Sequence, residues 1–297
     1  MKTSRLTLTC IFLSFVGALP AMAGPRIFVS GLGNDANPGT REQPKRTFAS
    51  ALTVTDAGGE VVVLDPAGFG SSTLLIDKSV SIIVPAGIFG GIRVTSGPAI
   101  TVAAGPTDTV VLRGLTLNSG GGTHGIEFQS GAALHVENCI IHGFTGGAGI
   151  VVSSSAGESA RLYVKDTICR RNNLGIRCNA GRGSLDHVRL EQNATGLLVA
   201  GSGTQVSIAN SVASGNTFYG LFGNGSAELN IEDCLVANNP SRGINSDGGA
   251  TVRVSNSTVT NNGFGLYNGA TLLSRLNNTV QGNTANKSGT IGSFAAD

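Results

Sequence analysis

The sequence contains no tryptophan, and the three aromatic residue types together make up only 5% of its 297 residues. Charged residues are also scarce, at 13%. A globular enzyme core of this size usually contains more aromatic side chains. The 44 glycines instead suit many short strands joined by tight turns. The composition therefore favours an all-β chain.

A long apolar run occurs only at the start of the chain. It covers residues 6–19, follows a basic beginning, and is too short and too often interrupted by Ser and Thr to cross a bilayer. An Ala-Met-Ala cleavage pattern follows at 21–23. We expect residues 1–23 to be a signal peptide and 24–297 the mature domain. The protein should then be secreted, periplasmic or extracellular, with no integral membrane segment after cleavage.

Neither sign of charge dominates. The precursor carries 20 Lys and Arg against 18 Asp and Glu, and loss of Lys2 and Arg5 with the signal peptide leaves 18 against 18. A chain without net charge has no overall attraction for nucleic acid or an anionic membrane. We therefore expect no nucleic-acid partner, and a charged polymer would have to bind a local patch.

A repeat of 21 to 26 residues runs through the second half of the chain. It is marked by a glycine followed by an apolar residue, as in GIEF at 125, GIVV at 149 and GIRC at 175. Each repeat contains short stretches of alternating apolar and polar residues separated by Gly, Asn and Ser, without a helical stripe. Three short strands per repeat are typical of a parallel β-helix, in which successive coils stack about 4.8 Å apart.

Stacked coils align equivalent residues into columns. One column should occupy a turn, where Asn and Asp tolerate a left-handed backbone and stacked amides bond to one another. Each repeat also closes near a further asparagine. The turn column is Asn138, Asp166, His187, Asn210, Asp233, Asn256 and Asn278. The closing asparagines are Asn172, Asn193, Asn216, Asn239, Asn262 and Asn283.

The repeats, with the opening RIFVSGLGNDANPGTREQPKRTFASAL and the following GGEVVVLDPAGFG, resemble right-handed parallel β-helix repeat proteins of the pectin-lyase-like superfamily, in their exported bacterial form. The resemblance implies a single-stranded right-handed solenoid with an N-terminal cap at about 24–60. A short helix within 47–57 should cover the open end of the core. The family does not fix one activity. Its enzymes act on polysaccharides, so polysaccharide is the partner that the resemblance implies.

Two columns should face outward. The first is Glu127, Val151, Arg177, Leu198, Phe222, Asn245 and Tyr267. Phe222 and Tyr267 could stack on the apolar faces of sugars, or they could be isolated surface aromatics two coils apart. The second column is Glu137, Lys165, Asp186, Ala209, Glu232, Ser255 and Asn277.

The charges of the second column allow two interpretations. Glu137, Lys165 and Asp186 can form a surface salt-bridge ladder, or the two acids, about 10 Å apart, can form a hydrolytic pair. If the protein is an enzyme, it should be a polysaccharide lyase or glycoside hydrolase that uses Arg177, Lys165, His187, Glu137 and Asp186. The alternative is a non-catalytic structural or adhesion protein of the cell surface.

Arg170 and Arg171 precede Arg177 and could bind a uronate or sulfate with it at a basic corner. A solvated face is the other interpretation. The calcium-binding acidic clusters of pectate lyases are not visible in the outward columns. The polygalacturonase set NTD…DD…GHG…RIK and the DPHE motif of alginate epimerases are missing as well. The family resemblance is therefore not matched by the known catalytic motifs.

The sequence gives little indication of metal ligands or of disulfides. The four histidines lack zinc-site spacing, so we expect no metal and no cofactor. Cys169 and Cys178 flank one turn and could pair in an oxidising compartment, or they could remain buried thiols. Phe294 is the candidate plug for the C-terminal end of the core. The oligomeric state stays open.

Overall fold

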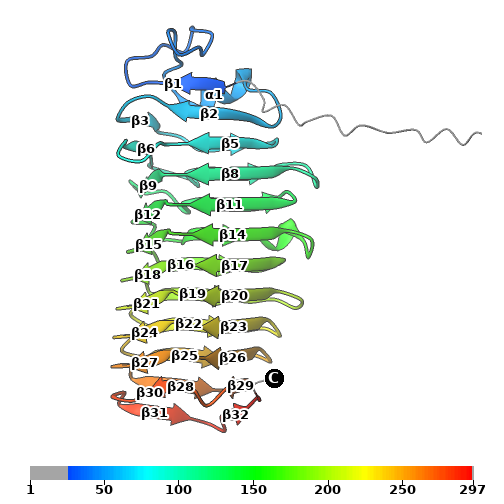
Figure 1. Ribbon diagram of the computed structural model, residues 1–297, viewed down its shortest axis with the longest axis vertical. Helices are drawn as coiled ribbons and strands as arrows, with labels where there is room; N and C mark the ends of the chain where they lie inside the picture. Colours follow the sequence, from blue (N-terminus) through cyan, green and yellow to red (C-terminus); the bar gives the residue numbers. More distant parts are fainter. Residues whose placement is uncertain (1–25, 296–297) are drawn as a thin grey trace, which may run out of the picture.

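The computed structural model describes residues 26–295, and these wind into a parallel β-helix with one strand of each sheet per coil (Figure 1). All strand pairs are parallel, and neighbours in a sheet belong to successive coils, as in the pairing of Val136 with Val164. The predicted all-β solenoid is confirmed. The predicted signal peptide lies outside the described residues. No helix in the described part of the chain is long and apolar enough to cross a membrane.

Three sheets, named A, B and C here, form the walls. Sheet A contains β1 (Arg26–Val29), β2 (Gly59–Val63), β5 (Val80–Ile83), β8 (Thr109–Arg113), β11 (Ala133–Glu137), β14 (Arg161–Lys165), β17 (Arg182–Asp186), β20 (Gln205–Ala209), β23 (Glu228–Glu232), β26 (Thr251–Ser255), β29 (Thr271–Ser274) and β32 (Gly292–Ser293).

Sheet B has the shortest strands. It contains β3 (Ala67–Gly70), β6 (Gly90–Val94), β9 (Leu115–Ser119), β12 (Ile140–His142), β15 (Ile168–Arg170), β18 (Arg189–Glu191), β21 (Val212–Ser214), β24 (Leu235–Ala237), β27 (Thr258–Thr260) and β30 (Thr279–Val280). Sheet C contains β4 (Leu74–Ile76), β7 (Ile100–Ala103), β10 (Ile126–Ser130), β13 (Ala148–Val152), β16 (Leu174–Cys178), β19 (Thr195–Val199), β22 (Tyr219–Gly223), β25 (Arg242–Ser246), β28 (Phe264–Asn268) and β31 (Ala285–Ser288).

Alternation of side chains places the apolar residues inside. In β11, Leu134 and Val136 are fully buried, while His135 and Glu137 point outward. Because every coil repeats this register, one continuous apolar core runs through the solenoid. Sheet A lies in front in Figure 1 and sheet C behind it, with their strands running in opposite directions across the core. The outer faces of sheets A and C therefore point away from each other.

The predicted capping helix is present as α1 (Phe48–Val54). Thr47 begins it, because its side-chain oxygen accepts a hydrogen bond from the Ser50 N–H at 3.1 Å. Phe48 is fully buried and packs against Phe69, with ring centroids 5.1 Å apart. The helix thereby shields the first coil from water. A short 3₁₀ helix, η1 (Ser154–Ala156), lies in the loop after β13.

The left-handed turn column is confirmed for six of its seven members. Asn138, Asp166, His187, Asn210, Asp233 and Asn256 have φ values between 49° and 52°. The last member is wrong, because Leu276 takes the positive φ in that coil. Asn278 instead accepts a hydrogen bond from the Ser257 N–H at 2.8 Å, one position further along the turn.

The amide ladder forms at the other turn, among the closing asparagines. Asn216 is fully buried; its Oδ1 accepts from the Asn193 N–H at 3.0 Å, and its Nδ2 donates to Asn239 Oδ1 at 3.0 Å. The same bond recurs in successive coils down to Asn283. We expected the amide ladder in the exposed left-handed turn column instead. That column has hydrogen bonds between coils, such as Asn210 to Asp186, but among the described residues it forms no continuous amide ladder.

The C-terminal end of the described chain closes differently from the prediction. Asn286 Oδ1 accepts from the Asn283 N–H at 3.2 Å and so supplies the partner that a further coil would have provided. Ile291 packs against the end of the core. Phe294 is not the plug, because it lines a hollow on the outer side of sheet A with Arg275 and Glu232.

Candidate functional site

The register of the predicted outward column of sheet C is confirmed in full, although the side chains of Val151 and Asn245 are buried. Strand pairing aligns Glu127 with Val151, Arg177, Leu198, Phe222, Asn245 and Tyr267 in that order. Phe222 and Tyr267 are therefore two coils apart, as expected. They are not isolated, because a second outward column runs beside them through Tyr219, Arg242 and Phe264.

These two columns build an aromatic–arginine patch from Tyr219, Phe222, Arg242, Phe264 and Tyr267. The Arg242 guanidinium carbon lies 3.5 Å from the Tyr267 ring centre and 5.4 Å from that of Tyr219. Tyr219 packs on Phe222 at 4.9 Å, and Phe264 on Tyr267 at 5.5 Å. The guanidinium thus lies between two tyrosines, where cation–π attraction holds it in place.

Asn245 forms the floor of the patch and is fully buried. Its Oδ1 accepts a hydrogen bond from Arg242 Nη1 at 3.1 Å, whereas its Nδ2 has no hydrogen-bond partner. A buried donor without a hydrogen-bond partner destabilises the folded state, and the Asn245 amide nitrogen is such a donor beside the aromatic rings. The patch therefore offers the Arg242 guanidinium and the ring faces to a ligand that carries acceptor oxygens, while the buried Asn245 holds the guanidinium in place.

Sequence reasoning found Phe222 and Tyr267 but missed Tyr219, Arg242 and Phe264. The missed residues each precede the repeat glycine, as in YGLF, RGIN and FGLY. Residues one and four of this unit both face outward, with the glycine and the following apolar residue buried between them. The identity of the residue before each repeat glycine could therefore have revealed this second outward column in the sequence.

The upper part of sheet C carries Arg177, whose Nε donates to Asn179 Oδ1 at 2.7 Å. His124 belongs to the same region, and its Nδ1 accepts from the Ala148 N–H at 2.9 Å. Partial burial lowers the pKa of His124, and Arg177 lowers it further, against the opposing effect of Glu127. Arg177 lies on β16 of sheet C, whereas the other four predicted catalytic candidates lie on sheet A or at its edge.

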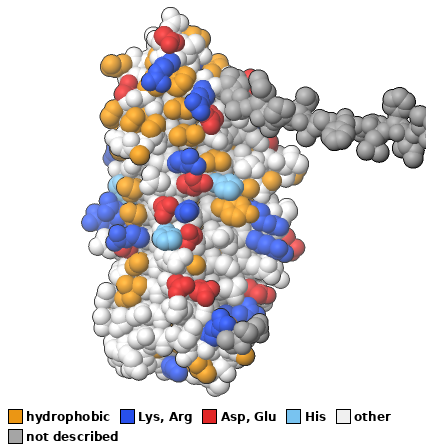
Figure 2. All heavy atoms as spheres, viewed as in Figure 1, with side chains coloured by type: hydrophobic (Ala, Val, Ile, Leu, Met, Phe, Trp, Pro, Cys, Tyr) orange, Lys and Arg blue, Asp and Glu red, His pale blue; other side chains and the backbone are white. Residues whose placement is uncertain are grey.

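Those four candidates form a charged strip on sheet A and its edge: Glu137, Lys165, Asp186 and His187. The predicted register of the first three is confirmed. The column ends differently: the pairing of β26 with β29 stops at Val254 and Ser274, and Asn277 instead accepts a hydrogen bond from the Asn256 N–H at 3.0 Å in the turn. Figure 2 shows the mixed charges and histidines across the middle of this face.

The expected ion-pair ladder is not the arrangement observed. Glu137 pairs with Arg113 of the preceding coil at 2.7 Å, and Lys165 takes part in no ion pair within residues 26–295. Asp186 accepts from Asn210 Nδ2 and His187 Nδ1, both at 2.9 Å. These hydrogen bonds lower the pKa of Asp186. Asp186 is thus held as a carboxylate and does not suit the role of proton donor.

The predicted basic residues Arg170 and Arg171 line a surface hollow of about 430 Å³ together with Gln192, Ser214 and Asn238. Arg171 has a left-handed backbone, and its Nε donates to Gln192 Oε1 at 3.2 Å. Arg170 lies at the end of β15 on sheet B, whereas Arg177 lies on sheet C. The three arginines therefore do not share one sheet.

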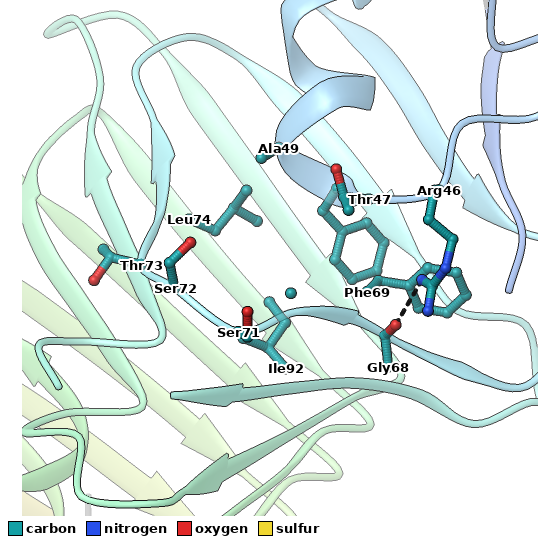
Figure 3. A pocket seen from close by; sticks show the side chains of 12 residues that line it. Arg46, Thr47, Ala49, Gly68, Phe69, Ser71, Ser72, Thr73, Leu74 and Ile92 are labelled. Atoms are coloured by element: carbon teal, nitrogen blue, oxygen red, sulfur yellow. Dashed lines mark hydrogen bonds between the residues drawn. The ribbon is translucent and has the colours of Figure 1, made fainter. Parts of the chain in front are cut away.

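A larger cavity, of about 480 Å³, lies between α1 and the first coil (Figure 3). Arg46 closes one side by donating to the Gly68 carbonyl at 2.8 Å, and Ser71, Ser72 and Thr73 supply hydroxyls on the other. Its floor consists of Phe69, Leu74 and Ile92, which belong to the core. We assign it to the junction of cap and solenoid.

Cys139, Cys169, Cys178 and Cys234 are buried free thiols, so Cys169 and Cys178 do not form the disulfide considered above. Burial raises the pKa of Cys139 and Cys178 to about 12 each. Across residues 26–295, no three His, Cys, Asp or Glu side chains gather as metal ligands would. The chemistry on offer is that of arginine, aromatic rings, carboxylates and imidazoles on open sheet faces.

Three parallel sheets that enclose one apolar core, with one strand of each sheet in every coil, define a parallel β-helix protein. The profile of the family described as "Right handed beta helix region" matches residues 99–285. The chain belongs to this family. No curated protein matches it in sequence.

Solved structures similar to this chain include pectate lyase Pel9A, with a TM-score of 0.65, 16% identity, and coverage of 93% of this chain and 78% of the other. The mannuronan C-5 epimerase AlgE4 A-module of Azotobacter vinelandii has a TM-score of 0.53 at 12% identity, covering 80% and 91%. A rhamnogalacturonan lyase has a TM-score of 0.51 at 14% identity, covering 92% and 87%. At these identities the likeness concerns the fold.

Proposed function

We propose that this is an exported protein that binds an acidic polysaccharide on the outer face of sheet C, without cleaving it. The observation that supports this most directly is the aromatic–arginine patch. Pyranose rings have apolar faces that pack on aromatic rings, and their carboxylates accept hydrogen bonds from a guanidinium. Arg242 has no carboxylate partner among the described residues, so its charge is available to an anionic ligand.

Two further groups support an acidic polymer. Arg177 lies in the same outward column as Phe222 and Tyr267, so a chain that follows the column can meet both charge and rings. Arg170 and Arg171 offer a second basic site at the turn between sheets B and C. The similar folds include a pectate lyase, a rhamnogalacturonan lyase and a mannuronan C-5 epimerase.

The second candidate function is catalysis as a lyase or hydrolase, for which the Asp186–His187 pair is the relevant observation. The carboxylate fixes Nδ1 of His187 as the donor, which leaves Nε2 as a possible base. Glu137 and Lys165 would complete the site on sheet A. Neither carboxylate suits the role of general acid, because Glu137 forms an ion pair with Arg113 and the pKa of Asp186 is lowered. We therefore rank binding above catalysis.

One experiment tests both candidates. Purified residues 24–297 are run in native gels that contain polygalacturonate, alginate or hydroxyethyl cellulose, and reducing ends are assayed in parallel. Retardation by the acidic polymers should weaken about tenfold in Arg242→Ala, since such an anchor dominates binding energy. Arg93→Ala, an exposed arginine on sheet B, is the matched control. Reducing-end release that disappears in His187→Ala would replace binding by catalysis.

A further inference from the structure

A second aromatic platform lies on the opposite face of the protein. Tyr163 of β14 stacks on His135 of β11, with ring centroids 4.6 Å apart and planes inclined by 19°. Tyr163 remains 41% exposed. The two rings follow one another along the solenoid axis, because their residues are directly paired in neighbouring coils.

The next positions in the same column are small. Tyr163 is paired with Ser184, and Ser184 with Ser207, so His135 covers one face of the tyrosine ring while the other faces two serines. Both serines are exposed. Since neighbouring strands are about 4.8 Å apart, the side-chain column steps down from the tyrosine to two serines over about 10 Å, and we call this step the notch. That length accommodates a pyranose ring.

Polar side chains line this notch. Lys165 and Asp186 occupy the neighbouring outward column, and Ser207 continues the notch into a hollow of about 240 Å³ with Asn230 and Glu232. Phe294 lines the far end of that hollow. We name the notch and hollow, from Tyr163 through Ser184, Ser207 and Asn230 to Phe294, the tyrosine groove. It combines ring faces at both ends with donors and acceptors between them.

We propose that the tyrosine groove is a second sugar-binding surface and that the protein bridges two polysaccharide chains. Sugar hydroxyls both donate and accept hydrogen bonds, which matches the mixed ammonium, carboxylate, amide and hydroxyl groups of the groove. The aromatic–arginine patch faces the other way, on sheet C. One stretch of a stiff chain cannot contact both faces across the core. This inference rests on the proposed binding function of sheet C.

The test counts ligands on each chain. Hexasaccharides of polygalacturonate, alginate and cellulose are titrated calorimetrically into residues 24–297, and cross-linking is followed as turbidity with the parent polymers. Two hexasaccharides should bind per chain. Tyr163→Ala and Ser184→Tyr, the latter filling the notch from outside the core, should each leave one. Thr109→Tyr, an exposed position on β8, two strands from Tyr163 on the side away from Ser184, is the control for added bulk and should leave two.

The outcomes separate the two proposals. Loss of turbidity in Ser184→Tyr, with one hexasaccharide still bound and that one removed by Arg242→Ala, supports bridging. A single site in the wild type that Arg242→Ala removes and Ser184→Tyr leaves intact overturns the bridging inference but not the proposed function. A wild type that binds none of the three hexasaccharides overturns both. A tyrosine-groove site without a sheet C site overturns the placement on sheet C, and bridging with it.

Discussion

The guanidinium of Arg242 packs on the ring of Tyr267, with 3.5 Å between the guanidinium carbon and the ring centre, although the two residues lie on adjacent coils and 25 positions apart in sequence. The same guanidinium donates to the buried Asn245 beneath it. Stacking from the side and a hydrogen bond from below fix its position. A fixed cation between rings loses little side-chain entropy when a ligand binds.

Asn245→Asp should weaken binding of acidic polymers about tenfold and leave any binding of neutral polymers unchanged. The new carboxylate would accept from Arg242 and neutralise the charge that the ligand uses. It would also remove the amide nitrogen that has no partner. Affinity electrophoresis on polygalacturonate and hydroxyethyl cellulose measures both effects. Equal loss for both polymers would mean that the charge of Arg242 is not what the ligand recognises.

Asn216→Ala should lower the free energy of unfolding by about 3 kcal/mol, because it strands the buried Asn193 N–H and Leu190 carbonyl at once. Asn173→Ala is the matched control, since Asn173 is an exposed asparagine without a left-handed backbone, and its side chain makes no hydrogen bond within residues 26–295. Urea unfolding of the two variants and the wild type provides the comparison. Similar losses in the two variants would show that the buried ladder adds nothing special to stability.

Stability should decline on acidification through the titration of His124. Its folded-state pKa is lowered by partial burial, so the unfolded chain, with a value of about 6.5, binds the proton more readily. The free energy of unfolding should therefore hold above about pH 6.5 and fall as pH drops from there toward the folded-state pKa. His124→Asn should flatten this part of the profile in urea melts from pH 5 to 8. An unchanged slope would exclude His124 as the cause.

The cysteines should resist alkylation at pH 8 until the protein unfolds. Burial raises the pKa of Cys139 and Cys178 to about 12 and that of Cys234 to about 11, so the reactive thiolate is rare as well as inaccessible. Iodoacetamide followed by mass spectrometry should modify none of the four cysteines in buffer and all four in denaturant. Protection of Cys169 and Cys178 in denaturant without reductant would reveal a disulfide between them.

The repeat in the sequence was enough to predict the solenoid and its columns, and the family resemblance of residues 26–70 predicted the capping helix. Coils of 21 to 26 residues stack at a constant spacing, so residues that are equivalent in the repeat become neighbours in space. The outward column from Glu127 to Tyr267 followed directly from this rule. The rule failed at the C-terminal coil, where Leu276 and not Asn278 takes the left-handed turn, because the repeat is no longer regular there.

The sequence by itself therefore determined the fold class and the register of the column from Glu127 to Tyr267, since a two-residue alternation and a coil-length repeat fix both. Tertiary structure decided which outward residues act together. It placed Arg177 and the charged strip on different sheets, joined Phe222 to Tyr267 through Arg242, and left one face of Tyr163 open beside Ser184. Such groupings depend on side-chain direction and size across coils, which one-dimensional periodicity does not encode.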